Sequence, residues 1–214
     1  MEKYVKIINI IDNSGSMGSM IDTAINGFNE FLIEQQKVEG KALVTTVLFN
    51  NKYEKLYDSL DINECYQLNK ENYITGGMTA LYDAIGKTIQ HELDILGNLP
   101  KEERPEKYLC VILTDGYENS SKEFDRSKVK SLIDEMKEGF NWEFIFLAAN
   151  EDASLTAETM GISKGNSYSF TNNADGLRDA YKGVSYAAMS YRSMSFSDTN
   201  LDLMDEYRKS KEEK

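Results

Sequence analysis

The chain has few of the residues on which most enzyme chemistry depends. Its 214 residues include one His, two Cys, one Trp and two Pro. His91 lies beside Gln90 and Glu92 on the solvated side of a predicted helix, so Ser-His-Asp and Cys-His catalysis have no credible base. Cys65 and Cys110 lack CxxC spacing and are too few for a disulfide framework. We therefore expect two reduced thiols in or near the core, with Cys110 fully buried, and no structural zinc site.

Long apolar runs and an excess of positive charge are also absent. Runs such as 144–149 are far shorter than the ~20 residues that cross a bilayer, and the opening MEKYVKIINIID has no small-residue cleavage site. We therefore predict a cytoplasmic protein. Basic residues number 24 against 36 acidic ones, a formal net charge of -12. This charge repels phosphate backbones and anionic lipid, so neither nucleic acid nor a membrane surface is an expected partner.

Apolar, β-branched segments alternate with helical patterns along the chain. Four short apolar runs are typical of parallel strands buried on both faces: 5–11, 42–49, 108–113 and 143–149. The segment 53–60 alternates in hydropathy and follows a short Asn-containing turn, which predicts an antiparallel edge strand. A last strand is expected at 167–170.

Apolar residues at helical spacing predict helices between these strands. The expected ranges are 20–36, 80–96, 127–137, 153–160 and 174–194. We expect Gly97 with Pro100 to end the second helix and Gly139 to end the third. The pattern predicts an α/β fold with a doubly wound, Rossmann-like, mostly parallel sheet, one antiparallel edge strand and helices on both faces. Residues 1–194 would form this domain, and 195–214 a charged tail or frayed helix.

The first strand leads directly into the sequence DNSGSMG. Asp12, Ser14 and Ser16 follow the pattern DxSxS, which places three small oxygen-bearing side chains at alternate positions of a loop before a helix. A hard divalent cation such as Mg²⁺ or Mn²⁺ takes ligands of this kind. A helix N-cap is the alternative interpretation, but it needs only one such side chain.

Two further motifs carry oxygen-bearing side chains that could bind the same cation. Thr79 lies in TGGMTALYDAIG, where it is also a plausible helix cap, and Asp115 lies in LTDG, which is also a plausible turn. In a doubly wound sheet, the strand before Asp12 and the strand before Asp115 are neighbours at the point where strand order reverses. The two carboxylates and Thr79 are therefore expected around one oxygen-lined cavity.

Together these motifs resemble the von Willebrand factor A domain and its metal-ion-dependent adhesion site. The resemblance runs from about residue 3 to about residue 194, and looks most like the small standalone cytoplasmic members from bacteria and phages. It implies the sheet order 3-2-1-4-5-6. It also implies a metal site in which three hydroxyls bind the ion and two carboxylates act directly or through water. The residues at the matching positions are Asp12, Ser14, Ser16, Thr79 and Asp115.

These residues favour a binding module over an enzyme. A Mg²⁺ or Mn²⁺ ion held mostly by neutral hydroxyls keeps an open position that accepts an Asp or Glu carboxylate from a protein partner. The alternative is a Mg²⁺-dependent phosphohydrolase at the same oxygen ligands, but loops 12–18 and 75–79 contain no Lys or Arg to hold a phosphate. The Tyr and Met side chains of 174–194 form a second candidate partner surface, although packing is the more frequent role of such a stripe. The sequence does not predict an oligomeric state.

Overall fold

A six-stranded sheet forms the centre of the molecule. The computed structural model describes residues 4–149, 152–194 and 201–212. The strands run in the order β3-β2-β1-β4-β5-β6, as expected. All neighbours are parallel except β2 and β3, which pair antiparallel at the edge. The strands are β1 (Tyr4–Asp12), β2 (Lys41–Phe49), β3 (Tyr53–Asp61), β4 (Lys107–Thr114), β5 (Trp142–Ala148) and β6 (Ser167–Ser169).

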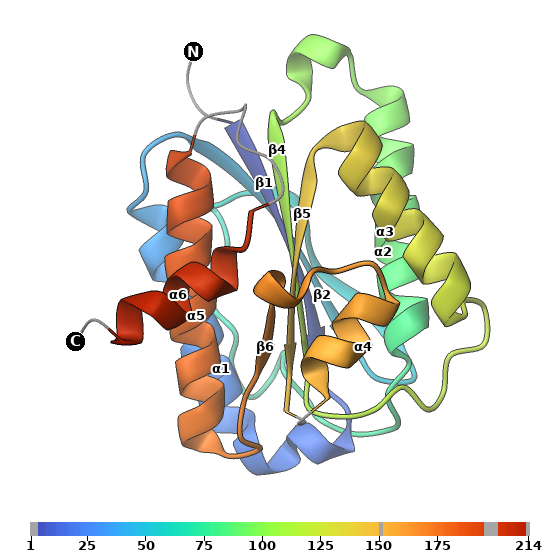
Figure 1. Ribbon diagram of the computed structural model, residues 1–214, viewed down its shortest axis with the longest axis vertical. Helices are drawn as coiled ribbons and strands as arrows, with labels where there is room; N and C mark the ends of the chain where they lie inside the picture. Colours follow the sequence, from blue (N-terminus) through green and yellow to red (C-terminus); the bar gives the residue numbers. More distant parts are fainter. Residues whose placement is uncertain (1–3, 150–151, 195–200, 213–214) are drawn as a thin grey trace.

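Helices cover both faces of the sheet, which confirms the predicted fold class (Figure 1). On one face lie α1 (Ile21–Gln36), α5 (Ala174–Ser193) and α6 (Leu203–Glu212), and on the other lie α2 (Leu81–Asn98), α3 (Arg126–Phe140) and α4 (Ala153–Thr159). Short 3-10 helices occur at η1 (Gly15–Met20), η2 (Lys101–Glu103) and η3 (Lys164–Asn166).

The apolar run of β1 reflects burial on both sides of the sheet. Val5 and Ile7 belong to the core beneath α1 and α5, whereas Ile8 and Ile10 belong to the core beneath α2 and α3. Successive side chains of a strand point to opposite faces, so a strand covered on both faces needs apolar residues at nearly every position. The same burial explains why the apolar segments predicted the central strands to within one or two residues.

Two helices extend past the glycines that were expected to end them. Helix α2 continues through Gly97 to Asn98, and α3 continues through Gly139 to Phe140. The left-handed residue that ends α3 is Asn141, with φ of 55°, and its N–H donates to the carbonyl of Met136. Asn tolerates this conformation nearly as well as Gly, so the glycine rule misplaced the end of the helix.

The end of the chain forms more than a charged tail. Helix α6 buries Leu203, Met204 and Tyr207, and the Tyr207 hydroxyl donates a 2.9 Å hydrogen bond to Asp179 of α5. A β-carbon at Gly183 of α5 would lie 2.7 Å from the terminal methyl group of Met204, so the missing side chain permits this close packing. Among residues 201–212, the expectation of a charged tail or frayed helix is corrected to a packed helix; 195–200 and 213–214 lie outside the described residues.

The two cysteines, and two tyrosines of α5, lie in the core. Cys65 and Cys110 are both free and buried, Cys110 with no exposed surface. In α5, Tyr181 and Tyr191 are buried, and a β-carbon at Gly27 of α1 would overlap the Tyr181 ring. These tyrosines of α5 therefore pack inside the domain. In the described part of the chain, no helix is both long and apolar enough to cross a membrane.

Candidate metal centre

Asp12 ends β1, and three contacts fix its position. Its Oδ1 accepts a 2.7 Å hydrogen bond from the backbone N–H of Ser14, and its Oδ2 accepts one of 2.6 Å from the hydroxyl of Thr114 in β4. Its backbone carbonyl accepts a further 2.6 Å bond from the hydroxyl of Tyr73. Because Ile11 pairs with Leu113 across the parallel strands, the ends of β1 and β4 lie side by side. The carboxylate is fully buried at this junction.

A chain of polar contacts connects the DxSxS loop to the end of β4. The hydroxyl oxygens of Ser14 and Ser16 lie 3.2 Å apart, and the Ser16 hydroxyl donates a 2.5 Å hydrogen bond to Oδ1 of Asp115. Ser14 occupies the N-cap position of η1 but its side chain makes no capping hydrogen bond. The helix-cap interpretation of this motif therefore fails, and both hydroxyls remain directed to the junction between the two strands.

Thr79 reaches the same place from the loop before α2. A β-carbon at Gly116 would lie 3.1 Å from the Thr79 hydroxyl oxygen and 3.6 Å from that of Ser16, so both hydroxyls lie next to Gly116. The backbone of Thr79 is fixed by Asn119, whose Oδ1 accepts from the Thr79 N–H at 2.9 Å and whose N–H donates to the Thr79 carbonyl at 3.0 Å. All five predicted residues thus converge at the carboxyl end of β1 and β4.

The side chains that cap the start of α2 come from the loop after β4 and not from Thr79. The N-cap residue is Ala80, which has no capping side chain. Instead, Glu118 accepts from the N–H of Tyr82, and the hydroxyl of Ser121 accepts from the N–H of Asp83, at 2.9 and 3.0 Å. The interpretation of Thr79 as a helix cap is therefore wrong. The loop that follows β4 supplies the oxygens that accept from the free N–H groups in the first turn of α2.

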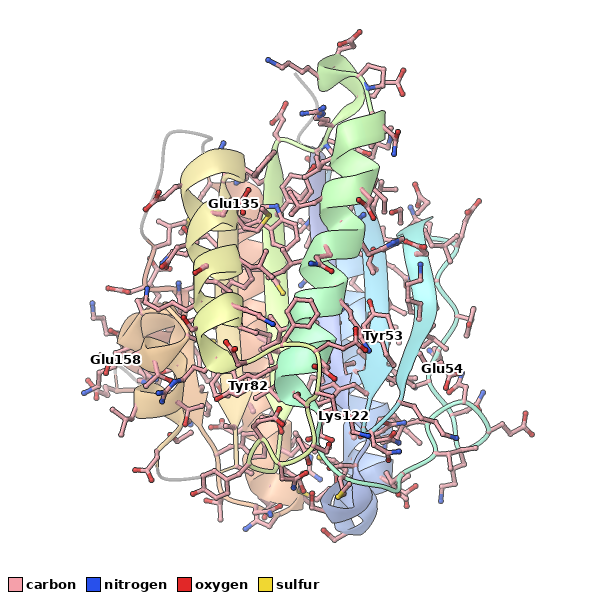
Figure 2. All side chains as sticks on the ribbon, turned by 90° about the vertical axis from the view of Figure 1, so that its right-hand side faces the viewer. Tyr53, Glu54, Tyr82, Lys122, Glu135 and Glu158 are labelled. Atoms are coloured by element: carbon pink, nitrogen blue, oxygen red, sulfur yellow. The ribbon has the colours of Figure 1, made fainter. Side chains whose placement is uncertain are left out.

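The Asp83 carboxylate holds the same loop in return. It accepts hydrogen bonds of 2.9 to 3.0 Å from three successive backbone N–H groups, those of Lys122, Glu123 and Phe124. Figure 2 shows Tyr82 and Lys122 together at the end of the molecule where α2 begins. This exchange of hydrogen bonds fixes the loop after β4, and with it Asp115 and Gly116, relative to α2.

Burial dominates the electrostatics of the two site carboxylates. It raises the pKa of Asp12, an effect that hydrogen bonds from Thr114 and Ser14 oppose, and it raises the pKa of Asp115, where the Ser16 hydroxyl opposes it. Neither carboxylate forms an ion pair with a Lys or Arg among the described residues. The site therefore concentrates negative charge without a protein cation to offset it.

The oxygen atoms of the five site residues are suitable ligands for a small, hard divalent cation. Oδ2 of Asp115 is buried and has no hydrogen-bond partner, which leaves an acceptor atom directed to no described protein group. Three hydroxyls and two carboxylates are oxygen ligands of the type that Mg²⁺ and Mn²⁺ prefer. No group of three or more His, Cys, Asp or Glu side chains in the described ranges could hold a metal. Any metal here would thus depend on the hydroxyls.

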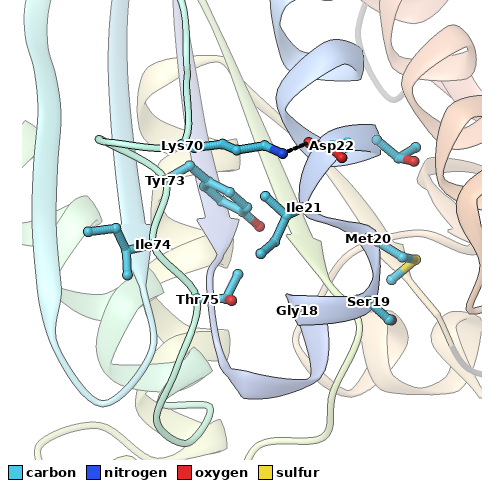
Figure 3. A pocket seen from close by; sticks show the side chains of 10 residues that line it. Gly18, Ser19, Met20, Ile21, Asp22, Lys70, Tyr73, Ile74 and Thr75 are labelled. Carbon is cyan, nitrogen blue, oxygen red and sulfur yellow. Dashed lines mark ion pairs between the residues drawn. The ribbon is translucent and has the colours of Figure 1, made fainter.

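A cavity of about 550 Å³ borders the site on the side of α1 (Figure 3). Gly18 and Thr75 line it, and the ring of Tyr73 forms part of its wall. An ion pair of 2.8 Å between Lys70 and Asp22 spans its edge, and both side chains are mostly exposed. The cavity lies between η1 and the segment that leads to Thr79, and none of the five site residues lines it.

Sequence reasoning missed three residues that position the site. Thr114 lies within the LTDG motif and its hydroxyl could have been noted beside Asp115. Tyr73 and Asn119 carry no local signal, because their partners are 61 and 40 residues away in the chain. Only the fold brings the Tyr73 hydroxyl to Asp12 and the Asn119 side chain to Thr79.

Comparisons with known proteins agree with this geometry. The family model of the von Willebrand factor type A domain matches residues 7–182. A search among curated proteins found no match. The ArnB paralog VWA2 from Sulfolobus acidocaldarius has a TM-score of 0.57 at 18% identity, over 85% of this chain and 45% of that one. Proximal thread matrix protein 1 from the mussel byssus, with zinc occupying its MIDAS motif, has a TM-score of 0.58 at 18% identity, over 88% and 46%.

Manganese-loaded TRAP protein from Plasmodium vivax matches at a TM-score of 0.55 and 14% identity, over 82% of this chain and 72% of that one. The chain thus spans less than half the length of the first two solved structures. At these identities the structures show a shared fold. The family model covers most of the chain, from β1 into α5. The chain therefore belongs to the von Willebrand factor type A domain family.

Proposed function

We propose that this protein is a divalent-metal-dependent protein-binding module. Asp12, Ser14, Ser16, Thr79 and Asp115 would hold Mg²⁺ or Mn²⁺ at the carboxyl end of β1 and β4. The observation that carries the proposal is a cluster of hydroxyls at the end of β4: that of Ser16 bonds Asp115, that of Ser14 lies beside Ser16, and that of Thr79 lies next to Gly116. Oδ2 of Asp115 has no hydrogen-bond partner among the described residues. Metal occupancy in two solved relatives, with zinc in one and manganese in the other, supports it.

The metal would supply a Lewis-acidic position for a carboxylate oxygen of the partner, an Asp or Glu. The residues of the chain prepare that position. Asp12 and Asp115 together carry the charge that neutralises one divalent ion, and the hydroxyls of Ser14, Ser16 and Thr79 add oxygens without charge. Thr114 and Tyr73 keep Asp12 in place, so the site needs little rearrangement to bind.

Three large apolar side chains close in sequence to Thr79 or Asp115 are exposed. Ile74 is 66% exposed, Met78 56% and Tyr117 64%, and they lie in the loops that carry or follow Thr79 and Asp115. Large exposed apolar residues gathered beside a polar site are typical of interaction surfaces. We propose that these three side chains pack against the residues of the partner that flank its Asp or Glu.

Three sequence-based predictions belong to this proposal. Residues 1–194 would form the domain, to which α6 adds a packed helix. The protein would act in the cytoplasm of a bacterium or in a phage-infected cell. It would be no enzyme, since the site loops 12–18 and 75–79 contain no Lys or Arg to hold a phosphate. A Mg²⁺-dependent phosphohydrolase is the alternative, and p-nitrophenyl phosphate tests it: turnover with Mg²⁺ that Asp12→Ala abolishes would favour the enzyme.

Mn²⁺ provides the test of the binding module. Bound Mn²⁺ enhances the relaxation of water protons, and acetate that enters its open coordination position displaces water and lowers that enhancement. We expect wild type to bind Mn²⁺ and respond to acetate, and Ser16→Ala to bind Mn²⁺ at least tenfold more weakly. Ser19→Ala is the matched control, since Ser19 is an exposed serine of the same 3-10 helix. Equal Mn²⁺ affinity in all three proteins would refute the assignment.

Partner binding is tested separately from metal binding. Proteins captured from a lysate on the immobilised chain should be lost in chelator and with Thr79→Ala, and retained with Ser19→Ala. Direct titration of a captured partner should then show loss of affinity when its contacting Asp or Glu is replaced by Asn or Gln. The net charge of -12 repels an acidic partner, so a modest rise in salt should strengthen the affinity. Capture that persists in chelator would contradict the metal-bridged contact.

A further inference from the structure

A second cavity lies at the opposite end of the sheet from Asp12. It has a volume of about 580 Å³ and lies where β1, β2 and β4 begin and α2 ends. This volume lies within the range of sites that hold small molecules. Most of its wall is apolar. The apolar side chains that line it are Leu43, Ile95, Leu96, Leu99 and Pro105.

Two opposite charges are buried in the wall and neutralise each other. Lys6 Nζ donates to Oε2 of Glu92 at 2.5 Å and to the hydroxyl of Ser59 at 2.7 Å. The hydroxyl of Thr45 donates to Oε1 of Glu92 at 2.9 Å. Both side chains of the ion pair are at most 3% exposed. The expectation that Glu92 lies on a solvated side of its helix is therefore wrong. This closed network pairs the two buried charges with each other.

The Tyr108 hydroxyl is a buried polar group of the wall without a hydrogen-bond partner in the described part of the chain. The residue is only 2% exposed. Burial raises the pKa of the Tyr108 phenol, and the Glu92 carboxylate raises it further. The group therefore remains an O–H donor at neutral pH. Buried hydroxyls normally have a hydrogen-bond partner, so an acceptor is missing here.

The mouth of the cavity disfavours anions. Glu102 and Glu103 lie at its edge, and the ammonium group of Lys41 there is placed 4.3 Å from the centre of the Tyr4 ring. A cation that entered would meet Glu92 already bonded through both oxygens. The interior therefore matches a ligand without charge.

We propose that this cavity binds an uncharged, mostly apolar small molecule that carries a carbonyl oxygen. The apolar body of the ligand packs against the aliphatic wall, and its carbonyl oxygen accepts the hydrogen bond of the Tyr108 hydroxyl. The site is independent of the metal centre, because the two lie at opposite ends of the strands.

The chain carries its own reporter for this site. Trp142 is the only tryptophan in the sequence, and its ring stacks on Tyr108 with centroids 5.2 Å apart and an interplanar angle of 9°. The probes are 1-indanone, which has a carbonyl oxygen, and indane, the same ring system without it. Binding is followed by Trp142 fluorescence and by thermal stabilisation.

We expect saturable binding of 1-indanone to wild type, with an affinity about two- to tenfold above that of indane, the factor that one net hydrogen bond supplies. Tyr108→Phe keeps the ring and removes the hydroxyl, and should reduce the affinity of the ketone to that of indane. Tyr57→Phe is the matched control. The hydroxyl of Tyr57 is also buried without a partner but belongs to the core on the other face of the sheet. It should leave both affinities unchanged.

A second variant tests the cavity itself. Leu99→Phe adds bulk to a partly exposed wall residue, and we expect it to weaken both probes. This variant carries the test if Tyr108→Phe fails to fold. No saturable signal with either probe in wild type would overturn the proposal and indicate a cavity that holds water only. Equal affinity for both probes in wild type, or equal loss in Tyr108→Phe and Tyr57→Phe, would also overturn it.

Discussion

The Thr114 hydroxyl donates a 2.6 Å hydrogen bond to Oδ2 of Asp12, and this bond joins β4 to β1 at the candidate metal centre. The same oxygen of Thr114 accepts from the Gly116 N–H at 3.2 Å. A single side chain thus orients the carboxylate of one strand and the loop that follows the other. Asp12 depends on a residue 102 positions away for its orientation.

Replacement of Thr114 by Val should weaken metal binding by about 10- to 100-fold, the usual effect of removing a group that orients a metal ligand. The shape of the side chain is kept while its hydroxyl is lost. Calorimetric titration with Mn²⁺ measures the change. Thr88→Val is the control, since Thr88 is a buried threonine of α2 whose hydroxyl donates to the carbonyl of Ala84. Equal affinities in the two variants would show that Thr114 does not act on the site.

Addition of Mg²⁺ or Mn²⁺ should raise the melting temperature of wild type, because a ligand that binds only the folded state stabilises it. At about one hundred times the dissociation constant, the gain in free energy of unfolding is about 2.7 kcal/mol. Asp115→Ala should abolish this gain. Asp94→Asn should keep it, because Asp94 is exposed and lies near the end of α2 that is remote from the site. A gain of the same size in Asp115→Ala would place the ion elsewhere.

The stability contributed by Asp83 should disappear in acid. Burial acts to raise the pKa of this carboxyl, but hydrogen bonds from three backbone N–H groups outweigh burial, and the net shift is downward. A lowered folded-state pKa means that the contribution is present above the unfolded value of about 3.9 and is lost as pH falls through the folded value. Urea unfolding of wild type and Asp83→Asn should therefore differ most at neutral pH and converge as the pH falls through the lowered folded-state pKa of Asp83. A constant difference across this range would contradict the assignment.

A side chain at position 116 should disturb the metal centre. The β-carbon of Gly116→Ala would lie 3.1 Å from the Thr79 hydroxyl oxygen, so that hydroxyl has to shift by a few tenths of an ångström. We expect several-fold weaker Mn²⁺ binding with little loss of stability. The control is Gly76→Ala, whose β-carbon would have no neighbour within 4 Å. If both glycine variants bind Mn²⁺ like wild type, Thr79 is not a ligand.

Helix α6 should contribute to the stability of the whole domain. Met204 is fully buried against α5, and Met204→Ala should lower the free energy of unfolding by about 2 to 5 kcal/mol, as for other large-to-small changes in a core. Chemical denaturation measures this loss. The variant should keep the metal-dependent rise in melting temperature, because α6 packs against α5 and η3 and supplies none of the five site residues. Two unfolding transitions in wild type would instead show that α6 melts independently.

Hydropathy determined the type of the six strands and of α1 to α5 and their succession along the chain, but it did not predict the packed helix α6. Val5 to Ile11 is apolar at nearly every position because both faces of β1 are covered, and Tyr53 to Leu60 alternates because β3 lies at the edge. The ends of elements were harder to predict. Gly97 and Gly139 lie inside helices, since a glycine costs a helix only about 1 kcal/mol and packing outweighs that amount.

The sequence by itself determined which residues are candidates for the metal centre, because DxSxS and LTDG are local patterns that follow apolar strands. The tertiary structure decided which interpretation of each motif holds. Ser14 and Thr79 are typical N-cap residues, but Ser14 caps nothing, and Glu118 and Ser121 supply the oxygens that α2 needs. A backbone N–H donates to whichever oxygen the fold brings to it. Local sequence therefore identifies a donor or acceptor, and only the packed chain selects its partner.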